Sequence, residues 1–195
     1  VQAEEGVQAL RDVLDTLIVI PNDRLLQISG KDIKVNEAYL KSDEILSNGV
    51  KGISGLITQP GVINVDFADV KTILKDAGNA VLGIGRSTGE QRAPNAAQAA
   101  ISSPLLEANM DGAEGVLITI TGSEDLKLQE VNEAARVITE RADDNAEIIF
   151  GHTVDPTLDD AVEVTVVAAG FGPRPNRRIK SDSEINENGG DGLPD

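Results

Sequence analysis

Short runs of apolar, mostly β-branched residues alternate with segments of helical periodicity through most of this chain, and that alternation limits the possible folds most. The expected strands are 16–20, 80–85, 113–120, 146–151 and 161–169. Apolar residues recur at helical spacing in segments 3–14, 36–58, 66–77, 93–101 and 128–138. Such an alternation predicts an α/β sheet covered by helices. Because the last two strands follow each other closely, we expect a mixed sheet whose last pair is antiparallel.

The segment 36–58 carries the longest helical pattern. Its apolar positions share one face: Tyr39, Leu46, Val50, Ile53 and Ile57. Glycines also recur there at every third position, at 49, 52 and 55. Each glycine costs a helix about 1 kcal/mol relative to alanine. The sequence therefore predicts either that another element packs closely there or that the helix is locally weak.

Composition excludes several classes of function. The formal net charge of −16 makes binding to a phosphate backbone a poor hypothesis. Because the chain has no Cys, it can form neither a disulfide nor a thiolate zinc site. His152 is the single His, and we interpret it as an ordinary surface residue. The acidic pairs 143–144 and 159–160 lack the spacing of a calcium loop and are interpreted as solvated turns.

A glycine-rich stretch at 83–89 follows an expected strand and precedes an expected helix. Its spacing is GxGxxxG rather than the GxGxxG of a dinucleotide-binding turn. We interpret it as a tight loop without a ligand. A nucleotide-dependent enzyme that binds NAD or FAD at this turn stays as a distant alternative.

The stretch Asn64-Val65-Asp66-Phe67-Ala68-Asp69-Val70 follows a Pro-Gly turn and opens an amphipathic helix. Carboxylates three residues apart on a helix lie on one face. One interpretation is that Asp66 caps the helix and that Asp69 complements its dipole. The other is that the two carboxylates orient and polarise an attacking water beside a nucleotide that a partner brings. The residues alone leave both open.

This stretch resembles the synergy (T7) loop of FtsZ, the tubulin-like cell-division family of bacteria and archaea. The other segments that resemble the family in register are 15–26, 83–85 with 89–93, 101–107, 112–117, 120–122 with 125–126, and 164–168. The resemblance covers about residues 1 to 171. The family also carries an N-terminal GTP-binding domain with a GGGTGTG phosphate loop, and that motif does not occur in this sequence.

The resemblance implies an FtsZ-like C-terminal domain, with a mixed sheet of about four strands flanked by helices and preceded by a core helix. We place the end of this central helix at 1–14, the GTPase-activating domain at 15–171 and a disordered tail or linker at 172–195. The missing GTP-binding half and the start without Met suggest a fragment of a longer chain.

The resemblance also implies a function. FtsZ subunits stack head to tail into protofilaments, and the synergy loop completes the GTPase site of the neighbouring subunit. Asp66 and Asp69 would position the attacking water, and Asn64 would contact the neighbour's nucleotide. GTP and Mg²⁺ belong to the full polymer, so the isolated chain should be an inactive half-site without a bound cofactor.

The expected partners are the nucleotide-binding domain of another subunit, and division-ring proteins that bind a C-terminal peptide not recognisable here. Nucleic-acid binding and membrane insertion are not expected. The implied location is the cytoplasmic division ring at mid-cell. The alternative function is an interaction module that caps filament ends without catalysis.

Overall fold

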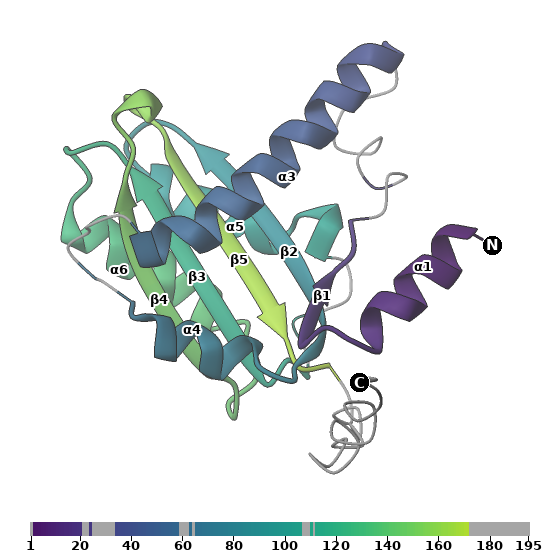
Figure 1. Ribbon diagram of the computed structural model, residues 1–195. Helices are drawn as coiled ribbons and strands as arrows, with labels where there is room; N and C mark the ends of the chain where they lie inside the picture. Colours follow the sequence, from purple (N-terminus) through teal and green to yellow (C-terminus); the bar gives the residue numbers. More distant parts are fainter. Residues whose placement is uncertain are drawn as a thin grey trace, which may run out of the picture.

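In the computed structural model, which describes residues 2–20, 24, 34–58, 63, 65–106, 110 and 112–171, helices cover both faces of a five-stranded sheet (Figure 1). The strands are β1 (Thr16–Ile18), β2 (Gly78–Ser87), β3 (Gly115–Gly122), β4 (Glu147–Val154) and β5 (Val162–Ala169). The α-helices are α1 (Gln2–Arg11), α3 (Val35–Thr58), α4 (Phe67–Leu74), α5 (Arg92–Ile101) and α6 (Leu128–Thr139). Short 3₁₀ turns span Pro104–Leu106 and Pro156–Leu158. The predicted fold class is confirmed, and the strand expected at 16–20 forms the short β1 at one edge, which makes five strands instead of the about four that the resemblance implies.

The strand order is β1-β2-β5-β3-β4. β3 and β4 are parallel neighbours, whereas β5 is antiparallel to both β2 and β3. β4 and β5 therefore run in opposite directions, as predicted, but they are not neighbours. The side chains explain this: β5 is apolar and buried on both faces, which suits a central strand, whereas the first half of β4 is partly exposed.

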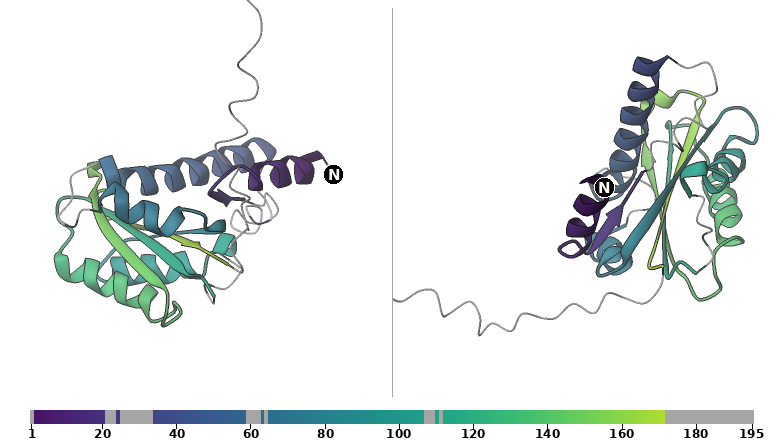
Figure 2. Two further views of the ribbon diagram at one scale, coloured as in Figure 1. Left: turned by 60° about the horizontal axis from the view of Figure 1, so that its bottom comes forward. Right: turned by 90° about the vertical axis from the view of Figure 1, so that its right-hand side faces the viewer.

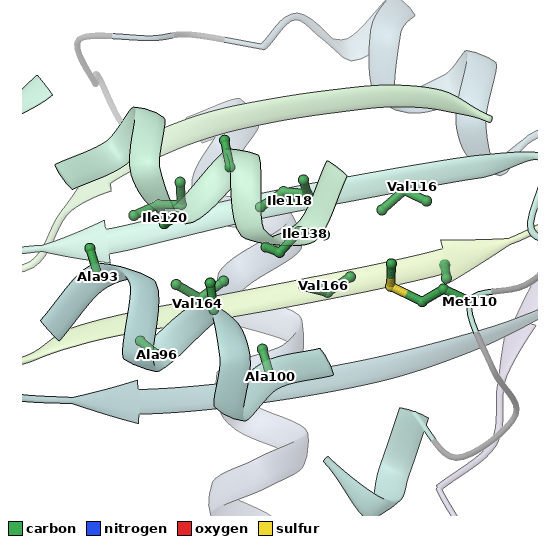
Figure 3. Packing of buried hydrophobic residues seen from close by; sticks show 14 of the residues in the cluster. Ala93, Ala96, Ala100, Met110, Val116, Ile118, Ile120, Ile138, Val164 and Val166 are labelled. Atoms are coloured by element: carbon green, nitrogen blue, oxygen red, sulfur yellow. The ribbon is translucent and has the colours of Figure 1, made fainter. Parts of the chain in front are cut away.

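Two apolar cores lie on opposite faces of the sheet. α5 and α6 cover one face, and α3 and α4 cover the other (Figure 2, right). On the α5 face, Ala93, Ala96 and Ala100 point at the Val and Ile side chains of β3 and β5 (Figure 3). Because these alanines are short, α5 lies close to the sheet.

The glycines of α3 are explained by close packing. A Cβ on Gly49 would lie 2.6 Å from Leu82 Cδ2, and one on Gly52 would lie 3.0 Å from Thr165. The Thr119 hydroxyl also donates a buried hydrogen bond of 2.9 Å to the carbonyl oxygen of Gly52. The close-packing prediction for this helix is therefore confirmed.

The predicted apolar face of α3 is only partly correct, because Ile53 packs against the core beneath α3 and α4 while most of that face points outward. Tyr39, Leu46 and Val50 are 66%, 56% and 59% exposed, because the glycine side of α3 faces the sheet instead. Four large apolar side chains around α1 and β1 are also well exposed: Leu10, Val13, Leu14 and Val19. No described helix is both long and apolar enough to cross a membrane.

α1 buries none of its residues and lies beside β1, whereas α3 runs along the face of the sheet (Figure 1). The assignment of 1–14 to a central helix and the boundaries at 14 and 171 stay predictions. The predicted tail at 172–195 lies outside the described residues.

Candidate functional site

Asp66 and Asp69 form a capping box at the start of α4. Asp69 N–H donates to Asp66 Oδ1 at 2.9 Å, and Asp66 N–H donates to Asp69 Oδ2 at 3.4 Å. Asp66 has extended backbone angles (φ −83°, ψ 166°), as an N-cap requires. The cap holds the two side chains together at the first turn of the helix, so the structure bears out the capping interpretation.

The capping bonds use one oxygen of each carboxylate. Asp66 Oδ2 and Asp69 Oδ1 lie outside those bonds, and both residues are exposed. Phe67, between them, is 65% exposed. Each of these two oxygens can accept hydrogen bonds from water. Asn64, the third predicted site residue, lies outside the described residues.

The site has few ligands of its own for a cation. Within the described ranges, no group of three or more His, Asp or Glu side chains is arranged to hold a metal ion. By themselves, Asp66 and Asp69 therefore supply too few ligands for a complete Mg²⁺ site.

The pair lies at the edge of the sheet, beside β4. Val65, which precedes Asp66, is buried in the α3/α4 core, and the carbonyl oxygen of Ile63 accepts a hydrogen bond of 3.1 Å from His152 N–H in β4. Sequence reasoning treated His152 as a surface residue, and that interpretation is wrong. His152 lies inside β4, which continues to Val154, and the residue is only 5% exposed. Burial lowers the pKa of its imidazole.

The glycine-rich stretch is not a ligand-binding turn. Gly83 and Gly85 lie inside β2, and a Cβ on Gly85 would lie 2.1 Å from the carbonyl oxygen of Ala96. These glycines allow the backbone of α5 to pack on the strand, so the space that a dinucleotide would need is filled. The tight-loop interpretation is also wrong for 83–87, which continue the strand.

An ionic cluster around the buried Arg92 is a feature that the sequence patterns do not predict. Arg92, 5% exposed, makes ion pairs with Glu130 (2.9 Å), Asp125 (3.0 Å) and Asp160 (3.3 Å). Asp160 also accepts the Gly89 N–H at 3.2 Å, so it is more than a solvated turn residue. The cluster joins α5 to the segments that follow β3 and precede β5. The only available signal was an Arg among alanines that otherwise form a buried helix face.

A groove runs between α3 and the strands β2 and β5. Two cavities of about 460 and 630 Å³ share Glu44, Asn48, Arg86 and Glu163 as lining residues. Asn48 Nδ2 donates to Glu163 Oε2 at 3.1 Å. Burial raises the pKa of the Glu163 carboxyl, and the nearby Arg86 opposes that shift.

Residues 78–172 match the C-terminal domain model of the FtsZ family. An FtsZ dimer structure from M. jannaschii is similar to 85% of this chain at 45% identity, with a TM-score of 0.81. A mutant FtsZ of that organism is also 45% identical over 87% of the chain, with a TM-score of 0.83. The chain spans about half of each of these proteins, 48% and 51%. A GTPγS-bound protofilament of CetZ2 from Haloferax volcanii, 17% identical over 88% of this chain and 52% of its own, shares the fold with a TM-score of 0.64.

Proposed function

This chain belongs to the FtsZ family and contains the tubulin-like C-terminal domain of that family, and from this premise we propose that the start of α4 completes a GTPase site on an adjacent subunit. The observation that carries the proposal is the geometry of Asp66 and Asp69, which keeps two exposed carboxylates in register at a helix start. The solved relatives described as a dimer and as a protofilament support self-association of this kind.

The chemistry divides between two subunits. GTP and Mg²⁺, held by the neighbour, supply the phosphoryl group and neutralise its charge. Asp66 Oδ2 and Asp69 Oδ1, which the capping bonds do not use, accept the two hydrogen bonds of one water molecule. A lone pair of that water then points away from the helix. A positioned carboxylate that accepts a proton contributes typically 10²–10⁴-fold to a rate. Asn64 is proposed to contact the nucleotide.

The neighbour is expected to meet an apolar contact as well as the two charges. Phe67 is 65% exposed and stands between the carboxylates. Aromatic side chains, Phe included, are enriched in the cores of protein–protein interfaces. The head-to-tail contact proposed here therefore includes Phe67.

The exposed apolar sides of α1 and α3 support a second contact. Tyr39, Leu40, Leu46 and Val50 on α3 are each more than half exposed, and the chain spans about half of its solved relatives. Apolar side chains gathered on one side of a molecule mark an interaction surface. We propose that the family's GTP-binding domain covers them and that the assembled protein acts in the cytoplasmic division ring, with division proteins as further partners.

Asp66→Asn separates the capping role of Asp66 from its proposed chemical role. The amide oxygen still accepts the Asp69 N–H and keeps the cap, whereas Asp66→Ala loses both the cap and the charge. The assay uses M. jannaschii FtsZ as the GTP-bound partner, with its own two loop aspartates replaced by alanine and at a concentration that prevents filaments. Addition of this chain should stimulate GTP hydrolysis, and Asp66→Asn should reduce the stimulated rate about 100-fold.

The control for that assay is the chain alone, which should neither bind nor hydrolyse GTP. Equal stimulation by the wild-type chain and by Asp66→Asn would refute the chemical role and leave only the cap. A second experiment adds Asp66→Asn to unmodified M. jannaschii FtsZ at less than one chain per FtsZ subunit. If filament growth still slows, the alternative role as a module that blocks filament ends gains support, because docking would then persist without catalysis.

A further inference from the structure

The outer side of β4 has no strand beside it in the described sheet. β4 lies at one end of the strand order, where an edge strand presents unpaired backbone groups. One of these groups, the His152 N–H, donates to the carbonyl oxygen of Ile63 at 3.1 Å. The chain that leads into α4 therefore binds the edge of the sheet through its backbone.

Gly151, the residue before His152, leaves room for the same segment. A Cβ on Gly151 would lie 2.6 Å from Leu56 Cδ2, 2.8 Å from Val65 Cγ2 and 3.3 Å from the Ile63 carbonyl oxygen. Ordinary van der Waals contact begins at 3.4 Å, so the first two distances are too short by about 0.6 to 0.8 Å. Any side chain at 151 must therefore displace the side chain of Leu56 at the end of α3 and the stiffer, β-branched side chain of Val65 before Asp66.

Ile63 and Val65 anchor the segment on opposite faces of the sheet. Ile63 packs against the α5/α6 core, whereas Val65 is buried in the α3/α4 core. At the edge of β4, the carbonyl oxygen of Ile63 accepts the bond from the His152 N–H. These contacts fix the chain immediately before Asp66.

We propose that Gly151 and His152 form a seat on β4 that sets the position of Asp66 and Asp69 relative to the rest of the domain. This inference rests on the proposed function, because it assigns to Gly151 and to the His152 backbone the role of positioning residues for that reaction. The capping box joins Asp69 rigidly to Asp66, so a shift of Val65 moves both carboxylates together. A misplacement of about 1 Å can cost a reaction as much as 100-fold.

The test compares Gly151→Ala with the matched control Gly122→Ala. A Cβ on Gly122 would lie 2.9 Å from Leu126 Cδ2, which is similar crowding by a flexible side chain, and the three atoms nearest to it all belong to Leu126 rather than to Ile63 or Val65. Both variants are added to the GTP-bound M. jannaschii partner described above, and both the maximal stimulated rate and the chain concentration for half-maximal stimulation are measured.

For Gly151→Ala we expect the maximal rate to fall about tenfold, with the half-maximal concentration changing less than threefold. Gly122→Ala should keep at least half of the wild-type rate. Hydrogen exchange on the chain alone should show faster exchange of the His152 amide in Gly151→Ala, with wild-type protection along β5. Ile63→Ala, which keeps the carbonyl but removes a partly buried anchor, serves as the second variant if Gly151→Ala does not fold, and it should also lower the maximal rate several-fold.

Three results would overturn the seat: a wild-type maximal rate in Gly151→Ala, a loss no larger than in Gly122→Ala, or an unchanged His152 amide. For Ile63→Ala, a wild-type maximal rate would overturn it equally. The failure of the proposed function looks different, because the wild-type chain would then give no stimulation at all. In that case the exchange of the His152 amide alone decides whether Gly151 holds the segment on β4.

Discussion

Arg92→Met should destabilise the chain by about 3 kcal/mol, and the structure assigns most of that loss to Glu130. Asp125 and Asp160 have side chains 59% and 70% exposed, so water can replace the guanidinium for each of them at little cost. The Glu130 side chain is only 16% exposed and loses two hydrogen bonds, of 2.9 and 3.3 Å. Breaking a buried pair on one side costs roughly 3–5 kcal/mol, and the low end applies because Glu130 keeps the Lys127 N–H as a donor. Methionine retains the apolar contacts of the arginine stem.

Urea unfolding of the wild-type chain and the variant, followed by circular dichroism, measures this difference. The slope of the free energy of unfolding against urea should stay the same, because the substitution hardly changes the surface area that unfolding exposes. Arg136→Met is the control: its pair with Glu140 is 3.7 Å long and exposed at 73% and 68%, so the loss should stay below about 0.5 kcal/mol. In the double variant Arg92→Met/Glu130→Gln, part of the lost stability should return, because no buried carboxylate is left unpaired.

The same cluster predicts a pH dependence. The hydrogen bonds from Arg92 hold the pKa of the Glu130 carboxyl below its ordinary value. A carboxyl whose pKa is lowered by folding stabilises the protein above its unfolded pKa, about 4.3, and that stability is lost as the pH falls through the folded pKa. The gap between wild type and Arg92→Met should therefore narrow below about pH 4. A loss under 1 kcal/mol at pH 7, or a gap that widens in acid, would refute this account of the cluster.

Two further predictions concern the two faces of the sheet. Glu163→Gln should raise the midpoint of thermal unfolding at pH 7, because burial raises the pKa of Glu163 and disfavours its charged form, while the amide oxygen still accepts the hydrogen bond from Asn48. The gain should shrink below about pH 4, where Glu163 is protonated in the folded and the unfolded protein. A lower midpoint for the variant at pH 7 would contradict this prediction. Gly85→Ala should lower the free energy of unfolding in urea by about 3 kcal/mol or more, because the new Cβ would lie 2.1 Å from the backbone oxygen of Ala96, which cannot rotate away. A loss no larger than that of Gly122→Ala would contradict close packing of α5 on β2.

Periodicity was sufficient for most of the elements but not for the order of the strands. The β-branched runs and the helical spacing located all five strands and the long helices, because each follows from local backbone preference and burial. The insertion of β5 between β2 and β3 depends on contacts far apart in sequence. The apolar residues at 162–169 do indicate a strand buried on both faces, but they do not say which strands lie beside it.

The misassigned face of α3 has a physical cause. Apolar periodicity normally identifies the side of a helix that faces the core, yet here glycines approach the sheet and the large side chains at 39, 46 and 50 face outward. A helix that is apolar on two sides can pack against two surfaces. The hydrophobic pattern alone does not show which of the two sides packs against the sheet of its own domain. The interpretation of His152 as a surface residue is wrong for a related reason. The burial of His152 depends on where β4 ends and on the contact of Ile63 with the edge of that strand.

The capping interpretation and the chemical interpretation of Asp66 and Asp69 need not exclude each other. The capping bonds take Asp66 Oδ1 and Asp69 Oδ2, and a cap of this kind fixes both χ1 angles in place. Carboxylates that were free to rotate would have to be ordered each time a neighbour docked, at a cost of up to about 1 kcal/mol each. A capped pair bears that cost during folding instead, so the second oxygen of each carboxylate is already oriented before docking. The cap is therefore a reason to expect fast chemistry at this position, and comparison of Asp66→Asn with Asp66→Ala measures how much of the rate comes from orientation and how much from charge.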